Sequence, residues 1–208
     1  MTVRRANAYL ALARLFEPPG AWQESRAEML REHFDFAGLG ELALEVAGKL
    51  EAALTHPESL ALAHAKLFVG PFEMQVPPYA SIYLDQEQRL MGPVSMDAAE
   101  AYAEAGLGPG EGPKEVPDHL TLELEFMYYL AFQGATSGAE SWAERQQRFW
   151  NEHLGRWLPE LAEALVKAET LPFYRSLAVL LEEFCRREVA HHDPTLGGRE
   201  TVIPKPSF

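Results

Sequence analysis

The sequence is poor in cysteine and has no long apolar run. Cys185 is the single cysteine in 208 residues, which excludes an internal disulfide framework and a metal site built from clustered thiolates. No apolar stretch approaches the roughly 18 residues that a membrane-spanning helix needs. We therefore expect a cytosolic protein with no membrane insertion, in which Cys185 is a small buried hydrophobe within a helix.

Basic residues are also scarce. The chain has 18 Lys and Arg against 31 Asp and Glu, a formal net charge of −13, and no dense stripe of Lys and Arg. A surface of this sign repels phosphate backbones, so nucleic acid is a poor partner. The acidic excess is typical of a soluble protein, and it favours a basic peptide as a ligand.

The sequence motifs of several common enzyme classes are missing. There is no Gly-x-x-x-x-Gly-Lys-Ser/Thr or Gly-x-Gly-x-x-Gly loop for a nucleotide, no Gly-x-Ser-x-Gly turn for a nucleophile and no His-Glu-x-x-His zinc motif. The sequence therefore predicts no bound cofactor of these types, and no motif requires a guanine nucleotide.

The N-terminus superficially imitates a twin-arginine export signal, because Arg4 and Arg5 precede apolar residues. Arg14 interrupts the apolar run, and no small-residue cleavage site follows. Tyr9 and Leu12 fall on one face of a helix. This segment is therefore predicted to be an amphipathic helix of the mature protein.

Apolar residues recur at helical spacing along most of the chain, and no stretch alternates as a strand would. Proline and glycine mark the helix ends, with Ser95 as an expected N-cap and Gly106 as an expected C-cap. We predict an all-α, single-domain bundle of about nine or ten helices over residues 1–190, with an irregular tail at 191–208. A long segment, residues 70–94, is expected to be an ordered loop with one short helical turn. Helices are expected at 3–16, 21–33, 39–55, 57–68, 95–107, 118–134, 139–154, 156–168 and 171–190.

The stretch EVPDHLTLELEFMYYL, residues 115–130, carries most of the chemistry. Asp118 follows a proline and is expected to be the N-cap of the helix. At about 100° per residue, His119 and Glu123 then share one stripe and Glu125 lies on its neighbour. A third stripe is purely apolar and is the expected core face: Leu120, Leu124, Met127 and Ala131.

These residues leave several functions open. A metal-dependent helical enzyme would use His119 with Glu123, or Glu188 with His191, but each pair supplies only two ligands. The cluster at His191 and His192 is a further candidate for a labile metal site. An acidic adaptor subunit that docks another domain needs no special motif. Purely structural roles, as a helix cap and an i,i+4 pair, are the remaining interpretation.

Two blocks of the sequence resemble a known family. LFVGPFEMQVPPYASIYLDQEQRLMGP, residues 67–93, and EVPDHLTLELEFMYYLA, residues 115–131, resemble the signatures of the TorD/DmsD/NarJ superfamily, and a short helix ending in Gly-Leu separates them. Ala80 stands where glutamate is common in the family. The resemblance implies an all-helical cytosolic chaperone for a molybdenum-cofactor oxidoreductase, working as a monomer or homodimer. It would bind the twin-arginine signal peptide, or its remnant, at the N-terminus of the catalytic subunit.

The resemblance also implies site residues, with Asp118 and His119 matching the family's Asp-His pair. A signal peptide presents two arginines and then an apolar helix, so its receptor needs carboxylates and an apolar, aromatic groove. Carboxylates at Asp118, Glu123 and Glu125 fit the arginines. The full predicted peptide-binding set is Leu67, Phe68, Phe72, Pro78, Tyr79, Ser81, Tyr83, Asp118, His119, Glu123, Glu125 and Phe126.

Overall fold

The protein is all-α, as its sequence predicts. The structure is a computed structural model that describes residues 3–21, 26–36, 38–70, 74–108 and 115–192. Within these ranges the sole β pairing is an isolated bridge between Tyr79 and His119. The helices are α1 (Val3–Leu15), α2 (Arg26–His33), α3 (Gly40–Leu54), α4 (Pro57–His64), α5 (Ala80–Leu84), α6 (Pro93–Glu104), α7 (Leu120–Ser137), α8 (Glu140–Phe149), α9 (Gly155–Lys167) and α10 (Pro172–His192).

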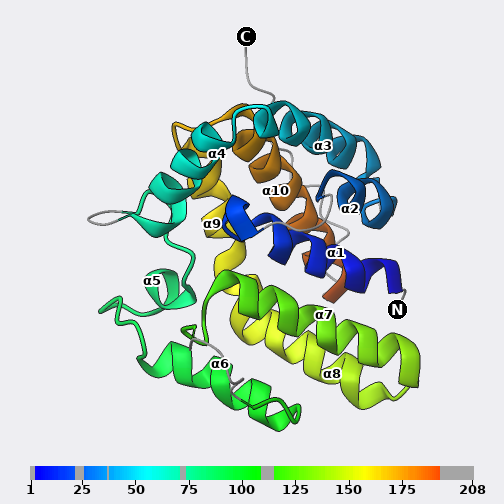
Figure 1. The fold of residues 1–208 in the computed structure, drawn as a ribbon. Coiled ribbons are helices and arrows are strands. Elements are labelled where there is room, and N and C mark those ends of the chain that lie inside the picture. The colour runs from blue at the N-terminus through cyan, green and yellow to red at the C-terminus, as the bar shows by residue number, and fades with distance from the viewer. Residues whose placement is uncertain (1–2, 22–25, 37, 71–73, 109–114, 193–208) are drawn as a thin grey trace.

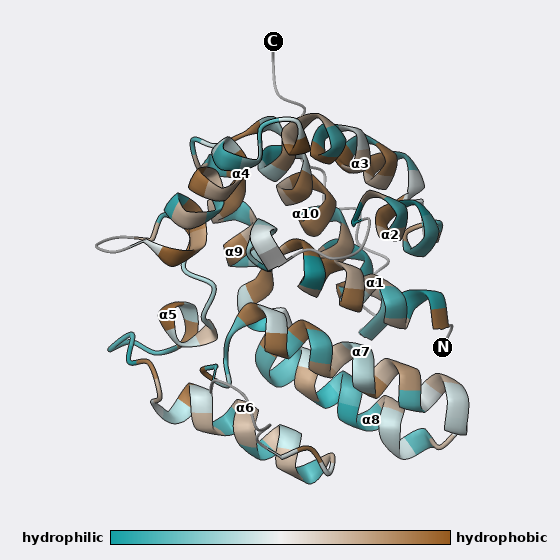
Figure 2. Ribbon diagram, in the orientation of Figure 1, coloured by the Kyte–Doolittle hydropathy of each residue, from teal (hydrophilic) through white to brown (hydrophobic). Residues whose placement is uncertain are grey.

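The centre of the bundle is formed by α1 packed on α7 and by α9 packed on α10. Helix α1 lies along α7, which is antiparallel to α8, and α9 packs against α10 (Figure 1). Helices α2, α3 and α4 cover one end, while α5 and α6 stand to the side of the α7–α8 pair. Much of α8 is hydrophilic, whereas α9 and α10 carry both apolar and hydrophilic residues (Figure 2). None of the described helices combines the length and apolarity needed to cross a membrane.

The predicted core face of α7 is confirmed. Leu120, Leu124 and Met127 are fully buried. Their partners include some of the largest buried side chains of the protein, among them Trp157 and Tyr9. Since each large apolar side chain contributes about 1.5–3 kcal/mol on burial, this shared interior stabilises most of the fold.

A buried polar contact joins the first and last helices. The carboxylate of Glu188 lies 3.1 Å from the Arg5 guanidinium and accepts a hydrogen bond of 2.6 Å from the Tyr9 hydroxyl. His192 Nε2 is 3.4 Å from the same carboxylate. We call these four residues the α1–α10 clasp. Arg5 therefore has a structural partner inside the fold.

Helix ends differ from the predictions in instructive ways. Helix α6 begins at Pro93 with Gly92 as N-cap, so the expected cap at Ser95 is wrong and its side chain lies inside the fold. Gly106 closes the helix in the left-handed region, at φ +81°, as expected of a C-terminal glycine. Helix α10 runs on to His192, past the predicted end at 190. The remainder of the predicted tail lies outside the described residues.

Two segments of π-helix interrupt the helical pattern, η2 (Ala65–Val69) and η3 (Trp150–Leu154). Each adds a residue to one turn and rotates the side chains that follow. Segment η3 leads directly into α9, and Gly155 at the junction sits against Trp150. A Cβ atom on Gly155 would lie 2.6 Å from the Trp150 carbonyl oxygen and 2.8 Å from its indole ring.

Gly155→Ala is therefore expected to lower the free energy of unfolding by about 2–3 kcal/mol, because Trp150 is buried and cannot move away freely. Gly48→Ala is the matched control: this glycine lies inside α3 with open space around it. Alanine there is expected to stabilise the protein by up to about 1 kcal/mol. Urea unfolding of both variants measures the difference. If Gly155→Ala is as stable as Gly48→Ala, η3 has adjusted to accommodate the added methyl group.

Candidate functional site

The two sequence blocks meet at the N-terminal end of α7. The Leu120 backbone N–H donates to the Pro78 carbonyl at 2.8 Å, and the Ala80 N–H donates to the Asp118 carbonyl at 3.0 Å. This short ladder contains the bridge between Tyr79 and His119. We call the paired segments, residues 78–81 and 117–120, the α7 junction.

Asp118 holds the α7 junction together from inside. Its side chain is fully buried and accepts hydrogen bonds from the Ser81 backbone N–H at 2.8 Å and from the Ser95 hydroxyl at 2.6 Å. The prediction that Asp118 caps α7 is wrong, because these two donors occupy its oxygens. Asp118 therefore ties α5 and α6 to α7 and is not exposed to a ligand.

His119 takes the capping position. Its Nδ1 accepts a hydrogen bond from the Thr121 backbone N–H at 3.3 Å. The half-buried imidazole lies edge-on to the Tyr79 ring, with 5.1 Å between centroids. Burial lowers the pKa of His119, although Glu115 and Asp118 raise it, and burial raises the pKa of Tyr79. Both rings are therefore neutral near pH 7 and partly accessible.

Glu123 is turned into the protein. Its fully buried carboxylate lies 2.6 Å from His153 Nε2 and accepts a 2.9 Å hydrogen bond from the Trp157 indole N–H. Burial raises the pKa of Glu123, with His153 and Trp157 opposing the shift. Burial alone lowers the pKa of His153, but the hydrogen bond and charge of Glu123 outweigh it and the net shift is upward. Glu123 therefore faces His153 and Trp157, whereas His119 caps the helix.

Of the other predicted site residues, two are partly accessible and five are buried. Glu125 is partly exposed and pairs with Arg14 at 2.9 Å. Tyr83 is half-buried and stacks on Trp157, with 5.5 Å between centroids. The buried members are Leu67, Phe68, Pro78, Ser81 and Phe126. Phe72 lies outside the described residues.

Burial of Leu67 and Phe68 corrects their expected place in a groove. Phe68 packs edge-on against Phe16 and Tyr174, at 5.5 and 5.7 Å between centroids. His64 Nε2 donates a hydrogen bond to the Phe16 carbonyl oxygen at 3.1 Å in the same interior. Leu67 and Phe68 therefore belong to the hydrophobic core with Phe16 and Tyr174.

The residue pairs considered for metal binding have other partners. Glu188 belongs to the α1–α10 clasp and faces His192, while His191 is exposed. Across the described ranges, no group of three or more His, Cys, Asp or Glu side chains is arranged to hold a metal ion.

Sequence reasoning missed His153, Trp157 and the role of Ser95. A glutamate among apolar residues on a helix signals a buried carboxylate that needs hydrogen-bond donors. The donors are 30 and 34 residues away in the sequence, and nothing local identifies them.

Comparison with known proteins places the chain in a family. Residues 24–163 match the family model described as "Nitrate reductase delta subunit". The match extends over more than half of the sequence, and the chain belongs to this family. Its membership confirms the resemblance seen in the two sequence blocks.

Two curated relatives are described as chaperones. The chain is 27% identical over 126 residues to "Chaperone protein TorD" of Aliivibrio fischeri, covering 59% of each sequence. It is 31% identical over 127 residues to "Tat proofreading chaperone DmsD" of Salmonella typhi, covering 61% of this chain and 59% of the relative. These alignments thus span about three fifths of the length of the curated relatives.

A solved structure shares the fold. It is the crystal structure of a protein assigned to redox enzyme maturation in Archaeoglobus fulgidus, with a TM-score of 0.55 and 20% sequence identity. The superposition covers 86% of this chain and 92% of the other. At this identity the similarity establishes the fold alone.

Proposed function

We propose that this protein is a chaperone for the maturation of a molybdenum-cofactor oxidoreductase. It binds the N-terminal twin-arginine signal peptide, or its remnant, of the catalytic subunit in the cytosol. It holds that subunit back while the cofactor is inserted. Membership of the family, and relatives named as chaperones, support a role without catalysis.

One observation carries the proposal: the two sequence blocks form one structure. The ladder at the α7 junction places Tyr79 of the first block against His119 of the second. Asp118 fixes both segments from behind through Ser81 and Ser95. An apolar peptide helix binds well to neutral aromatic rings that are already held in place. Little side-chain entropy of the receptor is then lost on binding.

The test is calorimetric titration with a synthetic twin-arginine signal peptide from a molybdoenzyme encoded beside this protein. We expect binding at micromolar affinity or tighter. His119→Asn removes the imidazole and keeps a good N-cap, so the fold is retained. We expect this variant to bind at least tenfold more weakly, an effect of about 1.4 kcal/mol.

His56→Asn is the matched control, because His56 is also a helix N-cap, at the start of α4. Its affinity is expected to equal that of the wild type. Absence of binding to the peptide and to the full catalytic subunit would overturn the proposed function. Unchanged affinity of a folded His119→Asn variant would move the site away from the α7 junction.

A further inference from the structure

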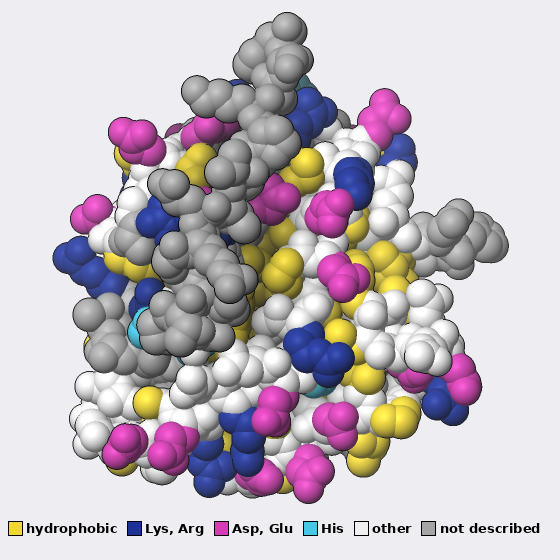
Figure 3. All heavy atoms as spheres, turned by 180° about the vertical axis from the view of Figure 1, so that it is seen from behind, with side chains coloured by type: hydrophobic (Ala, Val, Ile, Leu, Met, Phe, Trp, Pro, Cys, Tyr) yellow, Lys and Arg dark blue, Asp and Glu magenta, His cyan; other side chains and the backbone are white. Residues whose placement is uncertain are grey.

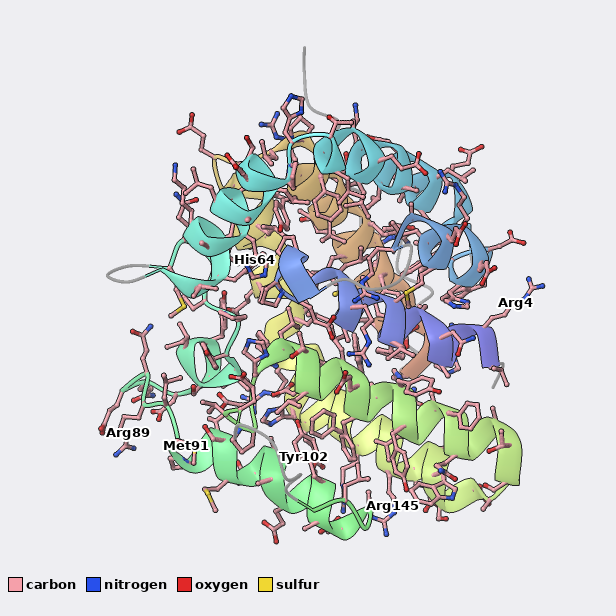
Figure 4. The ribbon with its side chains drawn as sticks, in the orientation of Figure 1. Arg4, His64, Arg89, Met91, Tyr102 and Arg145 are labelled. Atoms are coloured by element: carbon pink, nitrogen blue, oxygen red, sulfur yellow. The ribbon has the colours of Figure 1, made fainter. Side chains whose placement is uncertain are left out.

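A cleft of about 320 Å³ opens between α6, α7, α8 and η3, on the side of α7 next to the junction. Side chains of α6 and of the α8–η3 segment form its rim, and Phe126, Phe149 and His153 form its floor. Arg145 reaches from α8 toward the end of α6 in this region (Figure 4). We call it the α6–α8 cleft. Its volume is in the range of sites for small ligands or single side chains.

The rim carries a surplus of negative charge. Glu104 pairs with Arg145 and Arg148, which occupies both basic side chains of the cleft. The other three carboxylates, Asp97, Glu100 and Glu152, are exposed and have no ion-pair partner in the described part of the chain. On the rear face, acidic and basic side chains are interspersed (Figure 3). The unpaired carboxylates thus favour a cationic ligand.

The floor offers aromatic faces and one unused polar atom. Phe126 and Phe149 meet edge-on at 4.8 Å, and His153 stacks on Phe149 at 5.1 Å between centroids. His153 is 6% exposed and uses Nε2 for Glu123. Its Nδ1 takes part in no hydrogen bond with the described residues. At pH values above the raised pKa of His153, the imidazole is neutral with its proton on Nε2, and Nδ1 is then free to accept a hydrogen bond.

A guanidinium group suits these surroundings better than an ammonium group. It is planar, stacks on aromatic rings and donates several hydrogen bonds in fixed directions to carboxylates and to other acceptors. The spread of Asp97, Glu100 and Glu152 around an aromatic floor provides both kinds of contact. The cleft is also connected to the α7 junction through α6. Ser95 lies two residues before Asp97 on this helix, and its hydroxyl donates a hydrogen bond to Asp118.

We propose that the α6–α8 cleft binds an arginine side chain of the client's signal peptide while the apolar part of the peptide lies at the α7 junction. This rests on the proposed function for the identity of the ligand. It also replaces Asp118 and Glu123, which are buried, by Asp97, Glu100 and Glu152 as the carboxylates that meet arginine.

The probe is a capped tetrapeptide, acetyl-Ala-Arg-Arg-Ala-amide, titrated at pH 8 and low salt into the full-length protein. The indole N–H resonance of Trp157, which is hydrogen-bonded to the partner of His153, reports occupation of the floor and is assigned with Trp157→Phe. We expect this resonance to shift with the arginine peptide and to stay in place with acetyl-Ala-Gln-Gln-Ala-amide. The lysine analogue is expected to bind more weakly.

The triple variant Asp97→Asn/Glu100→Gln/Glu152→Gln is expected to bind the arginine peptide about tenfold more weakly, the order expected for three solvent-exposed ion pairs. The control Glu41→Gln/Glu58→Gln/Glu169→Gln changes net charge equally, and it alters exposed carboxylates on α3, on α4 and before α10. Its affinity is expected to match the wild type. Equal weakening in both triple variants, or no shift of the Trp157 resonance, overturns the proposal.

The same variants separate this proposal from the proposed function. If the long signal peptide binds the wild type and the cleft variant equally well, the chaperone function stands and the arginine site is elsewhere. If the long peptide fails to bind while the tetrapeptide occupies the cleft, the cation site stands and the chaperone function fails.

Discussion

Asp118→Ala is expected to lower the free energy of unfolding by about 3–4 kcal/mol. The change removes two hydrogen bonds to a buried carboxylate and leaves the Ser81 N–H and the Ser95 hydroxyl without their acceptor. A hydrogen bond to a charged group contributes about 1.5–3 kcal/mol, and a stranded buried donor adds a desolvation cost. Urea unfolding measures the change. Amide exchange at Ser81 is expected to become faster, because its N–H loses its partner.

Asp35→Ala is the control for this prediction. The Asp35 side chain is 81% exposed and lies 3.6 Å from Arg4. Such a surface pair is worth at most about 1 kcal/mol, so we expect a small change. A stable Asp118→Ala variant with slow exchange at Ser81 would mean that the backbone ladder alone holds the α7 junction. It follows that a loss of peptide binding in Asp118 variants needs a stability measurement before it is read as a lost contact.

Glu123→Ala is expected to destabilise the protein by about 3–5 kcal/mol at pH 6. The substitution leaves the His153 imidazole and the Trp157 indole without their buried acceptor, and it opens a cavity between α7 and α9. Glu163→Ala is the control, since its exposed side chain pairs with Lys167 one helical turn away. It is expected to cost less than about 0.5 kcal/mol. Denaturant unfolding of both variants tests the difference.

The pH dependence of Glu123→Gln gives a second measurement. In the folded protein the pKa values of Glu123 and of His153 are both raised. The folded state therefore binds more protons than the unfolded state, and the stability from this pair falls as pH rises from about 5 to 8. The advantage of the wild type over Glu123→Gln should shrink across that interval. An advantage that grows with pH would contradict the raised pKa values.

The sequence was sufficient for the fold class and for most helix positions, because the apolar period and the Pro and Gly breaks are local signals. The core face through Leu120, Leu124 and Met127 followed from the helical period alone. The π-helical turns at 65–69 and 150–154 contain no proline or glycine, so their sequences look like ordinary helix. Each was predicted as the end of a longer α-helix.

The site was predicted in part. The resemblance to the family's two signature blocks pointed to the segments that form the α7 junction, and the structure brings Tyr79 and His119 together there. The direction of the acidic side chains was not predictable. Asp118 finds Ser81 and Ser95 at separations of 37 and 23 residues, and such partners depend on how α5 and α6 fold back. A capping role was the local default, and tertiary hydrogen bonds displaced it.

The α1–α10 clasp has a consequence for the synthesis of the protein. Tyr9 and Glu188 are 179 residues apart in the sequence, so α1 leaves the ribosome long before its last partner exists. The apolar face of α1 stays exposed or loosely covered until α7 and then α10 have left the ribosome. Contacts at such separation slow folding and lengthen the time at risk of aggregation. A protein proposed to guard the incomplete fold of another protein is therefore itself incompletely folded until α10 has been synthesised.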